Sequence, residues 1–249
     1  MDFKFEKPSH IFALLLIIGT FFLIFIIPII TFFILIDSTQ LIENLEIPEV
    51  ITIVTQLFII IILFILVPFA WYYIVNKLKF KDILIRIKLV SENIDKAFLW
   101  GLFAAIISFI IIFIIEFALI KLGQKPQDLS NIPDLQRLFS WPVLFFLVTI
   151  QPIGEEIFFR GFLFEKIENF AGGILAIFFT AFLFGLAHMS YGKIFPVLMP
   201  ILMGIVLGFV VYKTKNLYSS IIAHVVFNVT SLTLAYLGQH LLEQFSLSL

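Results

Sequence analysis

Cysteine is absent from this 249-residue chain, and its absence excludes several kinds of site. Disulfide frameworks, thiolate zinc sites and cysteine nucleophiles all require this residue, so any metal would have to be held by histidine, glutamate or aspartate. Charge is also scarce, because only 13% of the residues are charged and the net charge is -1. Nucleic acids are bound by clustered lysine and arginine that neutralise phosphates, so this composition argues against a nucleic-acid partner.

Apolar residues, in contrast, make up 61% of the chain and include 33 phenylalanines. An ordinary soluble domain has roughly 45 to 50% apolar residues. This excess is more than one soluble core could bury, whereas lipid accepts apolar surface on every face of a helix. We therefore predict an all-α, multi-spanning integral membrane protein that lies in the lipid bilayer of the cell membrane.

The apolar residues fall into runs that are separated by polar segments. About 20 apolar residues cross the hydrocarbon core of a bilayer. The runs predict about seven transmembrane helices, at 11–36, 50–75, 98–121, 139–164, 172–188, 194–212 and 217–238. The first run is longer than the core of a signal peptide, which has about 7 to 15 residues, and no small-residue cleavage pattern follows it. It is therefore interpreted as a retained membrane helix.

The lysines and arginines of alternate loops predict the orientation in the membrane, because cytoplasmic loops retain positive charge. With the N-terminus in the cytoplasm, that side carries eleven basic residues and the other side carries four. We therefore predict a cytoplasmic N-terminus and an external C-terminus. The basic segment 76–97 is consistent with an amphipathic helix on the inner surface or with a solvated loop, and both interpretations stay open.

Ionisable side chains inside the last predicted spans form three clusters. An ionisable group within a membrane helix costs at least about 2.5 to 3.5 kcal/mol, so it requires a partner, a wet cavity or a function. On a helix, Glu156 and Arg160 are four residues apart with the acid first, which favours an ion pair, and Glu155 is rotated about 100° away. His224 and Asn228 are also four apart and share one helix face. The third cluster contains His188.

A glycine pair indicates how the cluster that contains Glu155 meets the cluster that contains His188. The midpoint of positions 155 and 188 falls at Ala171 and Gly172, beside Gly173. Glycine is common where a helix ends and the chain reverses. An antiparallel pair of helices that turns here places Glu155 level with His188.

These clusters have the patterns EExxxR, FxxxH and HxxxN, and with them the chain resembles the CPBP intramembrane proteases, the group that includes the Ras-converting CAAX endopeptidase. The resemblance covers 139–240 as a catalytic core within a single transmembrane domain, 1–249, whose residues 1–138 supply N-terminal spans and a basic cytoplasmic loop. It implies catalytic roles for six residues. Glu155 would be the general base with His188 holding the water, His224 and Asn228 would stabilise the oxyanion, and Glu156 with Arg160 would orient the site.

The resemblance leaves the cofactor open. Glu155, His188 and His224 could hold a divalent metal such as zinc with one open position, as in metalloproteases. The chain has no HExxH motif, so its spacing does not demand zinc, and a metal-free glutamate peptidase is the alternative.

The predicted function is an intramembrane endopeptidase of the CAAX type that hydrolyses peptide bonds of membrane-associated peptides or proteins. The composition looks bacterial, where prenylated substrates are not expected, so processing of bacteriocin or signalling peptides, with self-immunity as a role, is favoured. A non-catalytic membrane scaffold is one alternative. A transporter is another, but we find no repeat symmetry that would favour it. Glu116, a further membrane carboxylate, is the first candidate for an unrecognised site residue.

Overall fold

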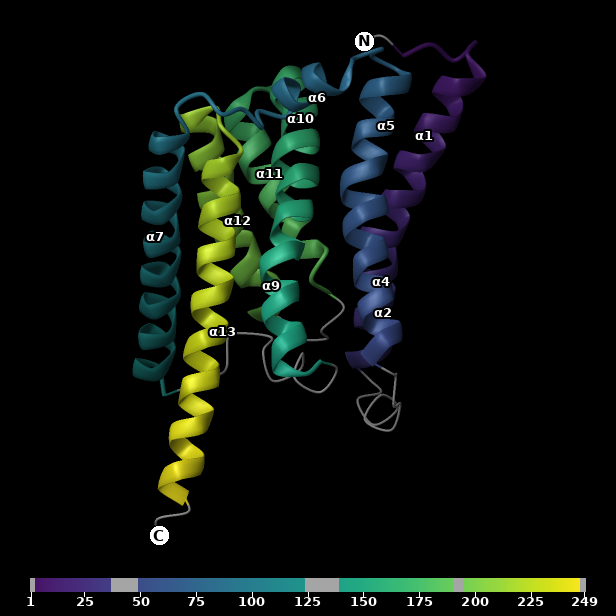
Figure 1. The fold of residues 1–249 in the computed structure, drawn as a ribbon. Helices are drawn as coiled ribbons and strands as arrows, with labels where there is room; N and C mark the ends of the chain where they lie inside the picture. The colour runs from purple at the N-terminus through teal and green to yellow at the C-terminus, as the bar shows by residue number, and fades with distance from the viewer. Residues whose placement is uncertain (1–2, 37–48, 124–138, 190–194, 247–249) are drawn as a thin grey trace.

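The computed structural model describes residues 3–36, 49–123, 139–189 and 195–246, and these residues form helices without a β-strand (Figure 1). The elements of the first half are α1 (Pro8–Phe21), η1 (Phe22–Ile26), α2 (Ile27–Ile36), α4 (Glu49–Phe58), η2 (Ile59–Leu66), α5 (Val67–Ile74), α6 (Phe80–Arg86) and α7 (Ile94–Lys121). Those of the second half are α9 (Trp141–Glu156), η3 (Ile157–Leu163), α10 (Phe164–Ala171), α11 (Gly173–Leu186), α12 (Phe195–Thr214) and α13 (Tyr218–Ser246). The segments labelled η have π-helical hydrogen bonding. The predicted all-α membrane bundle is confirmed.

Six helices within the described residues are long and apolar enough to cross a membrane. They correspond to six of the seven predicted spans. The fifth predicted span, 172–188, differs because α11 has only 14 residues. At about 1.5 Å per residue such a helix covers about 21 Å, which is less than the roughly 30 Å of the hydrocarbon core. Its sequence is apolar enough for a membrane helix but too short for a complete crossing.

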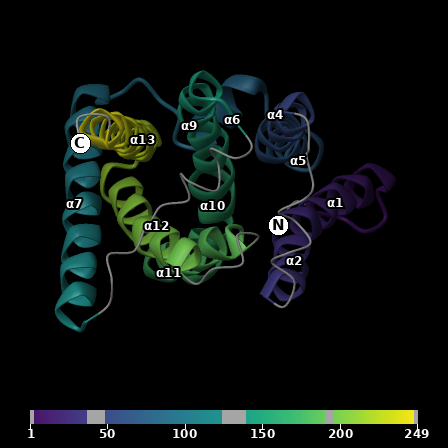
Figure 2. The ribbon, with the colours of Figure 1, turned by 90° about the horizontal axis from the view of Figure 1, so that it is seen from below.

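The helices form two groups when the bundle is seen along its axis (Figure 2). The helices α1, α2, α4 and α5 lie on one side, and the remaining long helices lie on the other. Aromatic side chains join the groups: the ring centroids of Phe64, in η2, and Phe158, in η3, are 5.4 Å apart. The group formed by α1, α2, α4 and α5, with η2 between α4 and α5, therefore packs against the segment that contains EExxxR.

The turn between α10 and α11 confirms the prediction made from the glycine pair. Helix α10 ends at Ala171, and Gly172 has φ of +87°. Side chains with a Cβ rarely adopt this left-handed conformation, so glycine is the suitable residue here. The two helices leave this turn antiparallel, and this arrangement brings Glu155 and His188 together.

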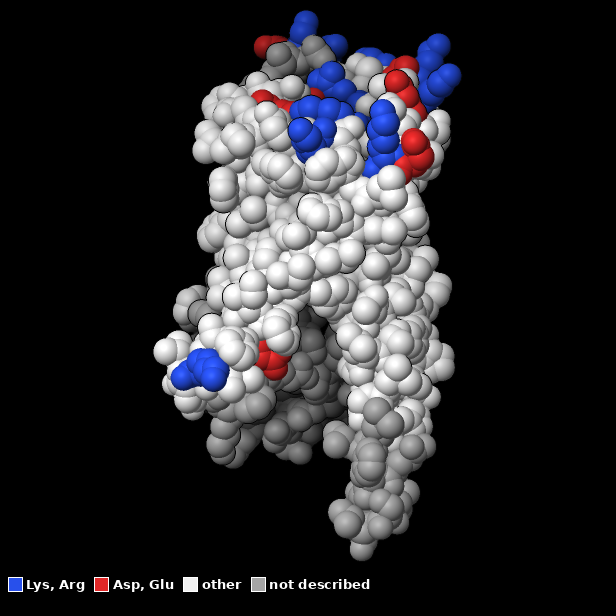
Figure 3. Space-filling view, turned by 90° about the vertical axis from the view of Figure 1, so that its left-hand side faces the viewer, with Lys and Arg blue, Asp and Glu red and all other residues white. Residues whose placement is uncertain are grey.

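Most of the basic side chains gather at one end of the bundle (Figure 3), where the N-terminus also lies, and the C-terminus lies at the opposite end (Figure 1). Within the predicted basic segment, 76–97, the structure has the short helix α6. Glu168 of α10 binds the ammonium groups of Lys88 at 2.6 Å and Lys215 at 2.7 Å. Burial lowers the pKa of Lys88, although its bond to Glu168 opposes this shift. These contacts tie the α10–α11 turn to two loops at the same end. Which end faces the cytoplasm stays a prediction.

Helices α11 and α12 approach closely at the glycines of a GxxxG pattern. A Cβ added at Gly204 would lie 2.9 Å from the backbone Cα of Ala181, whereas one added at Gly208 would lie 3.4 Å from the Cα of Ile177. The first distance is a clash with backbone and the second is an ordinary contact. The two glycines therefore differ in what they tolerate.

We expect the change Gly204→Ala to lower the free energy of unfolding, because α11 and α12 would have to separate. Overpacking of this kind typically costs about 1 to 3 kcal/mol. The matched variant Gly208→Ala should be nearly neutral, since alanine is also the better helix former. Thermal unfolding of the two variants in detergent measures the difference, and equal midpoints would contradict the packing described here.

Candidate active site

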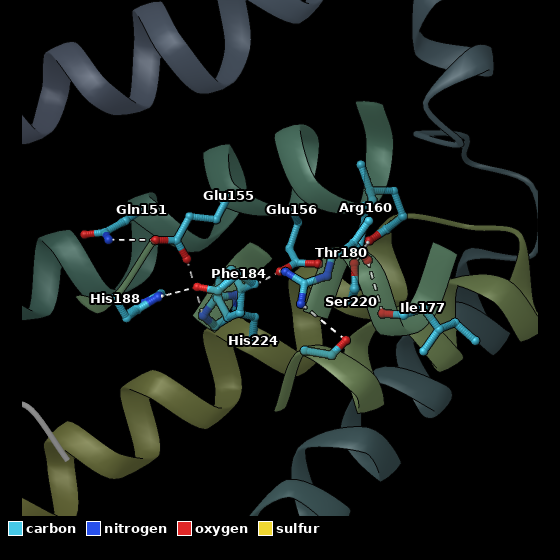
Figure 4. A network of polar contacts seen from close by, with 12 residues as sticks. Gln151, Glu155, Glu156, Arg160, Ile177, Thr180, Phe184, His188, Ser220 and His224 are labelled. Atoms are coloured by element: carbon cyan, nitrogen blue, oxygen red, sulfur yellow. Dashed lines mark hydrogen bonds and ion pairs between the residues drawn. The ribbon is translucent and has the colours of Figure 1, made fainter. Parts of the chain in front are cut away.

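Five of the six predicted site residues, all except Asn228, are seen together in one region of the bundle (Figure 4). Glu155 and Glu156 end α9, and Arg160 follows in η3. His188 comes just after α11, while His224 and Asn228 lie on α13. A π-helical segment directly after the two glutamates is consistent with a functional site, where such segments are frequent.

The Glu156 and Arg160 side chains form a fully buried ion pair. Their closest N–O distance is 2.8 Å and both side chains are 0% exposed. The Arg160 guanidinium also lies 4.4 Å from the ring centroid of Phe184 and donates to the carbonyl of Gly204 at 3.4 Å. Arg160 thereby connects η3 to α11 and α12. The predicted ion pair between Glu156 and Arg160 is present. It links neighbouring turns, and through Arg160 it also connects η3 with α11 and α12.

His224 contacts both glutamates. Its Nδ1 lies 3.0 Å from Glu156 Oε1, a carboxylate oxygen that accepts, so Nδ1 is the donor. Its Nε2 lies 3.7 Å from Glu155 Oε2. The direct bond to Glu156 goes beyond the sequence prediction, which assigned this carboxylate to Arg160 alone. Glu156 therefore fixes the orientation of the His224 ring, with Nε2 facing Glu155.

His188 is held by the last turn of α11. Its Nδ1 lies 2.8 Å from the backbone carbonyl of Phe184, and because a carbonyl only accepts, Nδ1 donates. This tautomer leaves Nε2 as the accepting nitrogen. The ring is partly exposed, whereas Glu155 is 5% exposed and His224 is 4% exposed. An acceptor on the more open side of the site suits a residue that holds a water molecule.

Asn228 lies one turn beyond His224 on α13, so the two side chains share a face of the helix. Asn228 is half-buried, and its side chain makes no hydrogen bond to another described residue. Glu116 lies on α7, which supplies none of the six predicted residues. Asn228 thus lies on the same helix face as His224, whereas Glu116 lies on another helix.

Gln151 is a polar neighbour of the site that the motifs do not include. Its Nε2 donates to Glu155 Oε1 at 2.7 Å from one turn earlier in α9 (Figure 4). Glu155 is thereby held at one oxygen by Gln151, while its other oxygen faces His224. A glutamine four residues before the proposed base is a weak signal, but it could have been found by asking which side chains share a helix face with Glu155.

We expect the change Gln151→Leu to lower the turnover number about tenfold or more, because a hydrogen bond to a charged group contributes about 1.5 to 3 kcal/mol. The Michaelis constant should change little if Gln151 orients the base without binding the substrate. Steady-state cleavage of a peptide substrate separates the two constants.

Thr149→Val is the matched control for this change, since the Thr149 hydroxyl donates only to the Phe145 carbonyl in the same helix. The assignment of Gln151 would fail if both variants lost the same activity, because such a result would indicate a general disturbance of α9.

The three predicted metal ligands, Glu155, His188 and His224, do not form a metal site in this arrangement. A zinc ion requires its ligand atoms at about 2.0 to 2.2 Å from one point. No group of three histidine, aspartate or glutamate side chains converges in this way within the described parts of the chain. The Nδ1 atoms of both rings are engaged, as described above, so each could coordinate only through Nε2. The metal therefore stays a prediction.

Comparison with protein families supports the interpretation of the three motifs. The chain matches the family model that is described as "type II CAAX prenyl endopeptidase Rce1-like". The match covers residues 137–230, a segment that contains all six predicted residues. Neither the curated proteins nor the solved structures that were compared with the chain give a match. The resemblance to the CPBP family of CAAX-type intramembrane proteases, predicted from the motifs, is confirmed by this match over residues 137–230.

Proposed function

We propose that this protein is an intramembrane endopeptidase in which Glu155 activates a water molecule. The observation that carries this proposal is the placement of Glu155: one carboxylate oxygen is fixed by Gln151 and the other faces His224 Nε2. A carboxylate held in this way, beside partly exposed groups and within an apolar bundle, is a suitable general base.

In the first step, Glu155 takes a proton from water as the water oxygen attacks the carbonyl carbon of the scissile peptide bond. His188 assists because its Nε2 can accept a hydrogen bond from the same water. Attack converts the carbonyl oxygen into an oxyanion. Amide hydrolysis requires donors at the position where this negative charge develops.

His224 and Asn228 are the proposed donors to the oxyanion. The Asn228 amide can donate directly. His224 donates from Nδ1 to Glu156, so it can donate to the oxyanion only when Nε2 also carries a proton. The adjacent carboxylates of Glu155 and Glu156 would compensate the charge of such a ring. Arg160 contributes indirectly, because it holds Glu156 in place.

The second step breaks the carbon–nitrogen bond. The proton on Glu155 passes to the leaving amine, the oxyanion collapses to a carbonyl, and the products are a carboxylic acid and an amine. The net reaction consumes one water per bond and returns Glu155 to its starting state. No step in this sequence requires a redox partner.

The proposed substrates are membrane-associated peptides or proteins, including bacteriocin or signalling peptides. In an apolar bundle the scissile bond would lie within or beside the bilayer, and this location favours apolar substrate segments. A role in self-immunity against bacteriocins is consistent with such substrates and stays a prediction.

The experiment is cleavage of a library of apolar membrane peptides by the purified protein in water enriched in oxygen-18, with and without a chelator. Hydrolysis predicts that the new C-terminal carboxylate contains one oxygen from the labelled water, which mass spectrometry detects. Sensitivity to the chelator would add a metal to the mechanism. Absence of cleavage across a broad library would favour the non-catalytic scaffold instead.

A further inference from the structure

The basic segment between α5 and α7 has an exposed surface that combines cations with apolar side chains. Helix α6 lies at the end of the bundle where the N-terminus is found, between α5 and α10 (Figure 1 and Figure 2). Exposed lysines occupy alternate positions at its start, Lys77, Lys79 and Lys81. Within the described residues, none of these lysines has a carboxylate at ion-pair distance. This part of α6 therefore carries an excess of positive charge.

Large apolar side chains are exposed beside these lysines. Phe80, the first residue of α6, is 66% exposed, and Ile85 is 55% exposed. On a helix Lys81 and Ile85 are four residues apart, so they share one face. The opposite face carries Ile83 and leads to Ile87, which are both buried in the main core cluster. Helix α6 thus has a core face and an outer face that is both cationic and apolar.

A lipid interface satisfies both parts of this outer face, whereas water satisfies only the lysines. Anionic headgroups attract basic segments beside a membrane helix, and interfacial helices bury their apolar side chains at the boundary of headgroups and acyl chains. Tyr73, in the last turn of α5, is 68% exposed directly before this segment. Tyrosine is enriched at membrane–water interfaces, so α6 lies at the level of the interface.

We propose that this surface of α6, formed by Lys77, Lys79, Phe80, Lys81 and Ile85, binds anionic phospholipids. The lysine ammonium groups bind the phosphates of the headgroups, while Phe80 and Ile85 lie among the upper parts of the acyl chains. With the basic end in the cytoplasm, as the charge distribution predicts, these are lipids of the cytoplasmic leaflet, which has a negative surface potential. This lipid partner is independent of the proposed peptidase function.

Helix α6 is attached directly to the segment that carries the two glutamates of the site. The Arg86 guanidinium lies 2.7 Å from Glu165 Oε1 in α10, which continues η3. A Cβ added at Gly161 of η3 would lie only 3.1 Å from the Cβ of Ile87, so the end of α6 packs closely on η3. A ligand that binds only the folded state stabilises it. Lipid bound to α6 should therefore stabilise the packing of η3 and α10.

Contact quenching tests the lipid preference, because a chain without cysteine makes every introduced cysteine the sole thiol. A fluorophore is attached to Ile85→Cys, and the protein is placed in nanodiscs with an equal mixture of phosphatidylcholine and phosphatidylglycerol. Bromine, which quenches on contact, is carried by the acyl chains of one lipid or of the other. The same fluorophore on Leu122→Cys, at an exposed residue after α7, reports quenching away from α6.

At Ile85→Cys, we expect brominated phosphatidylglycerol to quench several-fold more strongly than brominated phosphatidylcholine. The two lipids should quench equally at Leu122→Cys. The preference at Ile85→Cys should disappear when the lysines of the surface are replaced together, as Lys77→Gln, Lys79→Gln and Lys81→Gln.

The matched control removes the same charge from other exposed positions, as Lys4→Gln, Lys7→Gln and Lys96→Gln, and should keep the preference. Equal quenching by both lipids at Ile85→Cys, or loss of the preference in this control, would overturn the binding of anionic lipid by α6. Quenching by neither lipid would overturn it as well, since the surface would then lie in water and suit an acidic protein instead.

Thermal unfolding in detergent tests the stabilisation separately. Added phosphatidylglycerol should raise the midpoint of the parent protein more than added phosphatidylcholine does. The variant without the three lysines of α6 should lose this difference, and an undiminished difference would show that anionic lipid acts elsewhere. Neither measurement requires cleavage, so the lipid surface and the proposed function stand or fall independently.

Discussion

Glu155→Gln is expected to lower peptide cleavage by about 10² to 10⁴-fold, which is the usual contribution of general acid–base catalysis. The amide has nearly the same size as the carboxylate but cannot take a proton from water. It can still meet Gln151 after reorientation of the amide groups, so insertion and folding should be preserved. Cleavage of one defined peptide, with size-exclusion profiles of both proteins, measures both quantities.

Glu116→Gln is the matched control, since it removes another carboxylate of the bundle from α7. It should retain the activity of the parent. Equal losses in the two variants would show that the assay responds to any change in bundle charge. A loss confined to Glu116→Gln would move the role of base from Glu155 to a residue on α7.

Arg160→Met should cause the largest loss of stability, because it leaves the Glu156 carboxylate buried without its cation. Removing one partner of a buried ion pair costs about 3 to 5 kcal/mol. Both side chains are 0% exposed, so water cannot compensate the remaining charge. The thermal midpoint in detergent should fall sharply, and less protein should remain monodisperse.

The double variant Glu156→Gln with Arg160→Met should recover much of this stability, because no unpaired charge remains. It should not recover activity, since the His224 ring would lose the charged acceptor that orients it. Independent, additive effects of the two changes would contradict the direct contact between these side chains. Stability that recovers while activity does not would assign Glu156 to the orientation of His224.

The predicted site residues are conspicuous in the sequence because an ionisable side chain in an apolar helix has a high energetic cost. A glutamate, an arginine or a histidine in an apolar run is conspicuous, and the spacing on a helix then determines which side chains share a face. The pair Glu156 and Arg160 follows from this spacing alone. The turn at Gly172 is also predictable, since its positive φ requires glycine.

Other features depend on how distant helices pack, and a single sequence does not specify this packing. The contact of His224 with Glu156 joins residues 68 positions apart. Gln151 is unremarkable until its amide is seen on Glu155. Hydropathy also predicts α11 as a spanning helix, because an apolar run that stops within the bundle has the same composition as one that crosses it.

The buried ion pair also affects how the chain enters the membrane during synthesis. The span that contains α9, η3 and α10 has a mean hydropathy of 1.4, against 3.0 for the first span and 3.1 for the second. Glu155, Glu156 and Arg160 each oppose insertion, so this segment is a poor candidate for transfer into lipid by itself. Pairing of Glu156 with Arg160 within the same helix reduces this cost before other helices arrive. We expect the translocation machinery to release this span together with α11 to α13, so that the second half of the chain assembles as one unit.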